Sequence, residues 1–160
     1  MWSEKSQECS PYQGGFTLLE ILIAVLVLSI GLLGMAGLQA TSLRNNHDAY
    51  VTTRATYLAH DMADRMRANR TALATYTGLS GVSHDCVTAS CTPTDIAEND
   101  ISEWLAEVQD LPSGQGNIAQ AGALFTITVM WDELRNGATG VGCDPNNPTD
   151  LRCVSITTQP

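Results

Sequence analysis

The chain has 160 residues, which is enough for one domain and a membrane anchor. Its net charge of −9 argues against nucleic-acid binding by the main body, because such binding needs a basic surface. The sequence contains neither a phosphate-binding loop nor a Gly-x-Ser-x-Gly nucleophile motif. We therefore expect a protein that is not an enzyme and has no cofactor.

A pair of glycines near the N-terminus is followed by a long apolar run. Residues 14–20 read Gly-Gly-Phe-Thr-Leu-Leu-Glu, and the next 18 residues, 21–38, carry no charge. This run meets the length threshold for a transmembrane helix. A secretory signal peptide has its small residues after a shorter apolar region, so cleavage at these glycines would instead retain the apolar segment. An ordinary single-pass anchor remains the alternative.

Glu20 is the unusual residue of this segment. A carboxylate deep in a bilayer costs roughly 2.5–3.5 kcal/mol, so its position indicates a function and a partner. After cleavage the partner would be a free α-amine on Phe16, either in the same chain, where i and i+4 face each other, or in a neighbouring subunit. The simpler alternative is that Glu20 only stabilises the first helical turn through the helix dipole.

This order of residues resembles the class III signal of type IV prepilins and pseudopilins. The resemblance implies that residues 1–15 are a leader, that prepilin peptidase cuts between Gly15 and Phe16, and that Phe16 is then N-methylated. It also favours a role for Glu20 between subunits, where the charge sets the register of a filament.

The next segment predicts a long helix. No proline occurs between Thr17 and Arg70, and beyond the apolar run hydrophobic residues recur mostly in steps of three or four. They are Leu43, Val51, Ala55, Leu58, Met62 and Met66. The pattern predicts one helix from Phe16 to Arg70 with an apolar half and an amphipathic half. Such a helix would be ~80 Å long, of which the bilayer takes ~30 Å.

The rest of the chain predicts a smaller helix and a sheet. Residues 71–93 read as irregular, and a helix fits residues 95–111, with Asp95 and Glu98 as a capping box and Pro112 as its stop. Residues on its apolar face are Ile101, Trp104, Leu105 and Val108. Alternation predicts strands at residues 125–131 and 154–157, and more weakly at 117–120. We expect an α+β, pilin-like fold, with the long helix packed against a small antiparallel sheet and a second short helix.

Four of the five cysteines lie outside the leader, which contains Cys9. An even number in a small exported domain predicts two disulfides. Three connectivities are possible, and the local pairs Cys86–Cys91 and Cys143–Cys153 are favoured because each brackets a loop with turn residues. A zinc site is the alternative, although neither spacing is Cys-x-x-Cys. The second pair matches the position of the C-terminal disulfide loop of many pilins.

The cysteines also bear on membrane topology. The positive charges at Lys5, Arg44 and Arg54 would by themselves place the C-terminal side in the cytoplasm. Disulfides need an oxidising compartment, and the leader resemblance agrees with them. We expect a single-pass protein of the bacterial inner membrane with its head in the periplasm, and later a place in the pilus at the cell surface.

Three further groups could in principle bind a metal or act in catalysis. His60 and Asp64 stand at i, i+4 on the long helix, but such residues are more often ordinary surface groups. His84 lies near Cys86, whose thiol a disulfide would consume. A loop offers oxygen ligands for calcium, but residues of this kind also make turns. The loop ligands would be Asp144, Asn146, Asn147 and Asp150. We predict no catalytic residue and no metal site.

Several segments resemble PilV-type minor pilins in particular. They are residues 38–46, residues 61–70, Trp104, residues 111–114 and Trp131. The resemblance implies a low-abundance subunit that acts in filament initiation, in a tip or priming complex. Its partners would be other minor pilins, the major pilin, prepilin peptidase and the inner-membrane assembly machinery.

The resemblance divides the chain into a leader (residues 1–15), a membrane and filament-core segment (16–39) and an extracytoplasmic head (40–160). The nearer alternative is a minor pseudopilin of a type II secretion system, which has the same leader and long helix. A membrane-anchored enzyme or metal-binding module is the more distant alternative.

Overall fold

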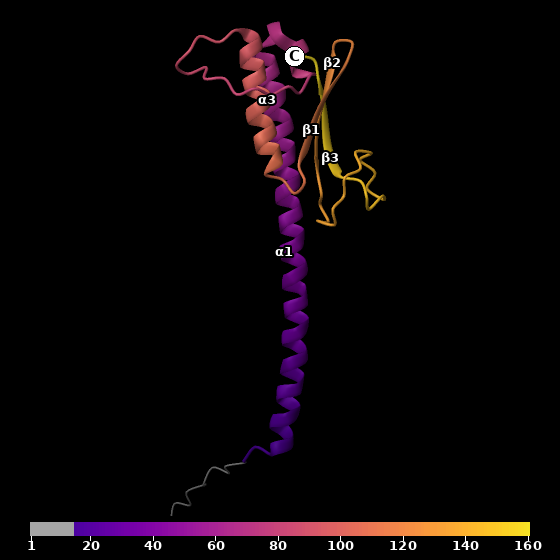
Figure 1. Cartoon of the computed structure of the whole chain (residues 1–160). Helices are drawn as coiled ribbons and strands as arrows, with labels where there is room; N and C mark the ends of the chain where they lie inside the picture. The colour runs from indigo at the N-terminus through magenta and orange to yellow at the C-terminus, as the bar shows by residue number, and fades with distance from the viewer. Residues whose placement is uncertain (1–14) are drawn as a thin grey trace, which may run out of the picture. The chain divides into compact units, whose positions relative to one another are not determined.

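The computed structural model describes residues 15–160, so the expected leader residues 1–14 lie outside the described part. The elements in chain order are α1 (Leu18–Ala68), the short 3₁₀ helix η1 (Arg70–Ala72), α2 (Leu73–Tyr76), α3 (Pro93–Gln109), β1 (Gln115–Ala121), β2 (Leu124–Trp131) and β3 (Arg152–Thr158) (Figure 1). The chain forms two compact units, which meet within α1 at Arg44 and Asn45. We call residues 15–44 the N-terminal unit and residues 45–160 the C-terminal unit.

The sheet is antiparallel, with strand order β1-β2-β3. β1 and β2 form a hairpin in which Ala121 pairs with Leu124, and Gly122 in the turn has a φ of +62°, a left-handed value that favours glycine. Ile127 pairs with Ile118 on one side and with Ile156 on the other. Phe125, Ile127 and Val129 are buried at alternate positions of β2, so the predicted half-buried strand is confirmed.

One core holds the C-terminal unit together, and the amphipathic part of α1, α3 and the sheet all contribute to it. From α1 come Val51, Ala55, Leu58, Ala59, Met62, Ala63 and Met66. From α3 come Ala97, Ile101, Trp104 and Val108. The long helix packed against a small antiparallel sheet with a shorter helix is thus the α+β, pilin-like fold that the sequence predicted.

Two details of the long helix differ from the prediction. α1 begins at Leu18 and ends at Ala68, two residues inside each predicted boundary. Leu43 is 70% exposed and does not belong to the buried stripe, which begins at Val51. The reason is that Leu43 falls in the N-terminal unit, where α1 is the only helix or strand among the described residues and nothing covers it.

The prediction for the start of the second helix was wrong. α3 is capped by Thr92, whose hydroxyl accepts a hydrogen bond from the Asp95 backbone N–H, while the Asp95 carboxylate accepts one from the Thr92 N–H. Pro93 therefore stands at the first helical position, which tolerates proline because its missing N–H would have no helical partner. Glu98, assigned to the box from the sequence, lies one turn further along.

The segment between the two long helices is also more ordered than predicted. Residues 70–76 form η1 and α2, and Tyr76 is fully buried in the core. Its hydroxyl donates a hydrogen bond of 2.6 Å to Oδ2 of Asp100 in α3. Burial and then this hydrogen bond raise the pKa of Tyr76. The short helix therefore anchors the start of the connection to α3.

Candidate functional site

The Gly15–Phe16 peptide bond lies just ahead of the first helical turn. Residues 15–17 are not helical, and both Gly15 and Phe16 are exposed, Phe16 at 80%. The Thr17 hydroxyl accepts a hydrogen bond of 3.2 Å from the Glu20 N–H, and its carbonyl accepts one from Ile21. Thr17 thus acts as the N-cap of α1, a role that sequence reasoning missed although Thr-x-x-Glu is a recognisable pattern. Gly15 and Phe16 therefore precede the helix as exposed, non-helical residues.

Glu20 lies in the first turn of α1 with an exposed side chain. Among the described residues, no hydrogen bond or ion pair reaches its carboxylate. A shallow groove along the helix surface contains Glu20 as its charged group, and its other lining residues are apolar. They are Phe16, Ile21, Ala24, Val25 and Leu28. The backbone N–H of Glu20 thus takes part in the helix cap, while its carboxylate is exposed.

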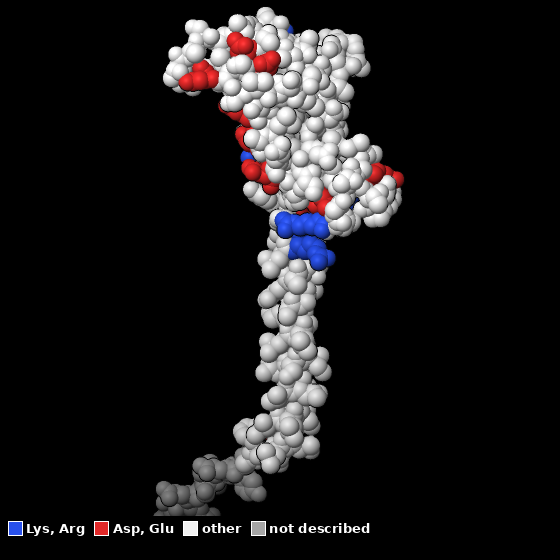
Figure 2. Space-filling view, in the orientation of Figure 1, with Lys and Arg blue, Asp and Glu red and all other residues white. Residues whose placement is uncertain are grey.

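The N-terminal unit presents an apolar surface. α1 is the one helix of the described chain that is long and apolar enough to cross a membrane. Two hydroxyl groups of this segment are satisfied within the helix, since Ser29 donates to the Val25 carbonyl and Thr41 to the Gly37 carbonyl. Internal hydrogen bonds of this kind are what a hydrocarbon environment requires. Figure 2 shows this segment as white, in contrast to the red acidic patches of the C-terminal unit.

The four cysteines of the described chain form two disulfides, Cys86–Cys91 and Cys143–Cys153, with Cα–Cα distances of 5.4 and 5.6 Å. These are the two local pairs that the sequence favoured. The first closes a loop between α2 and α3, so no free thiol remains at Cys86 for a nucleophile pair with His84. The second ties the loop before β3 to the strand itself, next to a small cluster of Met130, Ala138 and Leu151.

We expect the pair of substitutions Cys143→Ser and Cys153→Ser to lower the free energy of unfolding of the C-terminal unit by about 2–3 kcal/mol, because an open loop enlarges the unfolded ensemble. Chemical denaturation followed by circular dichroism measures the change. The pair Cys86→Ser and Cys91→Ser, which opens a shorter loop, serves as comparison. A wild-type fragment of residues 45–160, which lacks Cys9, should show no alkylatable thiol after denaturation without reductant, and four such thiols would contradict the disulfide assignment.

The loop considered for calcium uses its oxygen atoms to build turns. Asp144 Oδ1 accepts from the Asn146 N–H, Asn147 Oδ1 accepts from the Thr149 N–H, and Asp150 Oδ2 accepts from the Asp144 N–H. Three of the four candidate side chains therefore already accept a hydrogen bond from a backbone N–H. His60 is exposed on α1, and Asp64 forms an ion pair with Arg67 rather than a contact with His60.

Sequence reasoning missed a charged cluster between α1 and α3. Arg65 bonds to Asp61 at 2.8 Å, to Asp100 at 3.1 Å and to Glu103 at 2.8 Å. Burial by itself would lower the pKa of Arg65, but the hydrogen bonds to these carboxylates raise it overall, and the bond from Arg65 lowers the pKa of Glu103. The i, i+4 spacing of Asp61 and Arg65 was the available signal. The cluster fixes the second helix to the long one.

Comparisons with known families cover consecutive stretches of the chain. Residues 10–36 match the model described as prokaryotic N-terminal methylation motif, and residues 37–102 match the model described as type IV pilin Tt1218. No match was found among curated proteins or among solved structures.

A membrane-length helix that starts with a methylation motif and continues into an α+β unit defines a pilin-like structural subunit. Together with the second family match, this arrangement makes the chain a type IV pilin-like protein. The apolar helix and the motif fit anchoring in the inner membrane, with later assembly into a pilus.

Proposed function

We propose that this protein is a minor pilin of the PilV type, a structural subunit that helps to initiate the type IV pilus in a tip or priming complex. The observation that carries the proposal is the exposed Gly15–Phe16 bond directly before a membrane-length helix that contains Glu20. The sequence segments 38–46 and 61–70 support the PilV assignment within the pilin-like proteins. Its expected partners are other minor pilins, the major pilin, prepilin peptidase and the inner-membrane assembly machinery.

The proposal assigns a role to each part of the chain. Residues 1–15 are a leader, residues 16–39 the membrane and filament-core segment, and residues 40–160 the head. The head lies in the periplasm before assembly, which agrees with its two disulfides because these need an oxidising compartment. Its acidic side chains, seen in Figure 2, support partners other than nucleic acid.

Processing by prepilin peptidase gives the first test. We expect Gly15→Val to leave the full-length precursor in the membrane, because a branched side chain at the scissile bond would not fit where the enzyme reads a small residue. Wild-type protein should have the mass of a chain that starts at Phe16 and carries one methyl group. Intact mass spectrometry of protein purified from membranes measures both.

Gly31→Val provides the matched control. It places the same side chain further along the chain, in the apolar part of α1, where nothing lies within 4 Å of an added Cβ. Normal processing of Gly15→Val, or equal failure of Gly31→Val, would contradict cleavage at Gly15.

Deletion of the gene distinguishes the proposed minor pilin from a minor pseudopilin. A minor pilin that acts in initiation should leave few surface filaments when it is absent, with protein secretion unchanged. Normal filaments together with loss of secreted proteins would favour the type II secretion system instead. Filament counts by electron microscopy and the protein content of the medium measure the two outcomes.

A further inference from the structure

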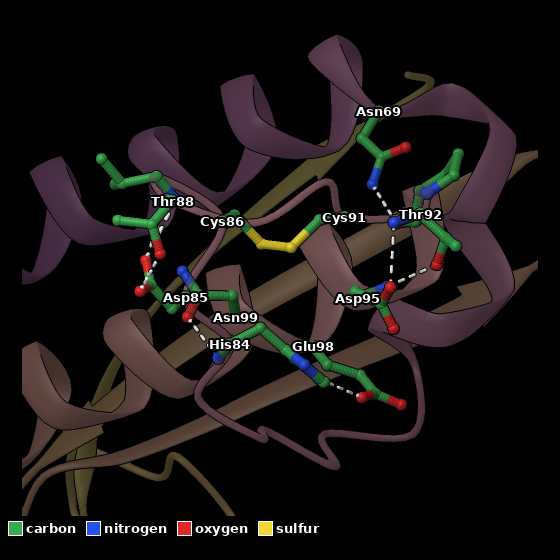
Figure 3. Close-up of a disulfide and its surroundings, with 12 residues drawn as sticks. Asn69, His84, Asp85, Cys86, Thr88, Cys91, Thr92, Asp95, Glu98 and Asn99 are labelled. Atoms are coloured by element: carbon green, nitrogen blue, oxygen red, sulfur yellow. Dashed lines mark hydrogen bonds and ion pairs between the residues drawn. A yellow bond between two sulfur atoms is a disulfide. The ribbon is translucent and has the colours of Figure 1, made fainter.

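A histidine and two carboxylates meet beside the Cys86–Cys91 disulfide. They are His84, Asp95 and Glu98, and their potential metal-ligating atoms all lie within 4.8 Å of one another. Each of the three residues is half-buried rather than freely exposed. Figure 3 shows the His84 ring directed towards the Glu98 carboxylate, with Asp95 on the same side of α3. The group combines residues from two separate segments of the chain.

Several contacts hold these side chains in place. The backbone N–H of His84 donates a hydrogen bond of 3.0 Å to Asn99 Oδ1, which fixes the loop against α3. The disulfide closes the loop just after His84, with a Cα–Cα distance of 5.4 Å. Asp95 and Glu98 are three residues apart on α3 and therefore project from the same face. The cluster is thus positioned by the fold before any ligand arrives.

Asp95 has a second role that leaves it able to bind a cation. Its Oδ2 accepts the hydrogen bond from the Thr92 N–H in the capping box, and this contact, followed by the one with the Thr92 hydroxyl, lowers the pKa of Asp95. A carboxylate has two oxygens, so the second can still coordinate an ion. The capping contact also holds the carboxylate in one orientation.

The donor set selects a class of metal. One imidazole nitrogen and two carboxylate oxygens suit zinc and related first-row divalent ions, whereas calcium and magnesium prefer oxygen ligands alone. Zinc bonds of ~2.0–2.2 Å require tetrahedral ligands ~3.3–3.5 Å apart. His84 Nε2 and Glu98 Oε2 are now 2.8 Å apart, so small side-chain rotations would open this pair and bring Asp95 closer. Three protein ligands leave a fourth position for water.

We propose that His84, Asp95 and Glu98 bind one zinc ion, or a related first-row divalent cation, and so fasten the disulfide loop to the start of α3. The ion replaces the hydrogen bond between the His84 ring and the Glu98 carboxylate. Its positive charge offsets the repulsion between the carboxylates of Asp95 and Glu98. Binding therefore stabilises the loop of residues 80–92 without any change in the core.

Zinc titration of the full chain in lipid nanodiscs tests the proposal. Isothermal calorimetry of chain without added metal should show one site, and zinc should raise the melting temperature. His84→Gln and Glu98→Gln should each weaken zinc binding by at least about tenfold, since even loss of residues that merely support metal ligands costs ~10–100-fold. Both variants should also lose most of the zinc-induced shift in melting temperature, whatever their stability without metal.

His60→Gln is the matched control, because His60 is an exposed histidine on α1 outside the cluster. It should bind zinc as wild type does. Wild-type affinity in His84→Gln and Glu98→Gln would overturn the proposal, as would an equal loss in His60→Gln. Calcium binding at the same site with affinity equal to that of zinc would also overturn it, because the imidazole would then contribute nothing.

Discussion

Trp104→Ala is expected to lower the free energy of unfolding of the C-terminal unit by about 4–5 kcal/mol, the upper end for loss of a large buried side chain. Trp104 has no exposed surface and lies where α1, α3 and β1 meet. Its Nε1 donates a hydrogen bond of 2.9 Å to the Leu58 carbonyl, so the substitution removes that bond as well as the packing. Denaturant titration of residues 45–160, followed by circular dichroism, measures the effect.

Gly116 in β1 provides a sharper test of the same contact. A Cβ added at Gly116 would collide with the Cη2 and Cζ3 atoms of the Trp104 ring. We expect Gly116→Ala to cost about 1–3 kcal/mol in the wild-type protein through overpacking. In a Trp104→Phe background, which removes these ring atoms, the added cost should fall below about 1 kcal/mol.

The effects of Gly116→Ala and Trp104→Phe on the free energy of unfolding should therefore be non-additive, as expected for residues in direct contact. Val87→Ala is the control, because Val87 is 96% exposed and its loss should change stability by no more than about 0.5 kcal/mol. If the costs of Gly116→Ala and Trp104→Phe simply added, the indole ring would not be what holds β1 against α3.

The longest periodic segments of this fold were predictable from sequence. The 3.6-residue pattern of α1 and the alternation in β2 each persist long enough to identify a helix or a strand. α2 spans only four residues, Leu73–Tyr76, too few for any period to appear, so its order depends on burial of Tyr76 and its bond to Asp100. The start of α3 was misplaced because residues 71–93 were read as irregular, although Pro93 is well suited to a first helical position.

The candidate sites also differ in how far the sequence alone could predict them. Gly15, Phe16 and Glu20 lie within one short motif, so the sequence alone brings them together. The cluster of His84, Asp95 and Glu98 combines a loop residue with residues of a helix, and only the disulfide and the Asn99 contact place the loop against that helix. Asp95 and Glu98 had also been assigned to helix capping, which concealed their shared face towards His84.

Glu20→Ala is expected to produce a protein that is cleaved, stays in the membrane and yet enters few filaments. Glu20 lies in the N-terminal unit, so stability of the C-terminal unit should not change. The substitution also removes an insertion cost of roughly 2.5–3.5 kcal/mol, so membrane retention should be at least that of wild type. What is lost is the charge that would pair with the α-amine of a neighbouring subunit.

The size of the defect follows from the amine that is left behind. An ion buried without its partner costs about 3–5 kcal/mol, and each 1.4 kcal/mol is a factor of ten in an equilibrium. Even partial access of water to that amine should leave at least a tenfold loss of the protein from sheared filaments, measured by quantitative immunoblotting against the membrane fraction.

Ser29→Ala is the matched control for this experiment, because Ser29 is an exposed polar residue of the same helix whose hydroxyl donates to the Val25 carbonyl one turn before it. It should enter filaments as wild type does. If Glu20→Ala also appeared in filaments at the wild-type level, the carboxylate would serve only the first turn of α1, where the Thr17 hydroxyl accepts a hydrogen bond from the Glu20 N–H. Assembly would then have to depend on the apolar surface of the helix alone.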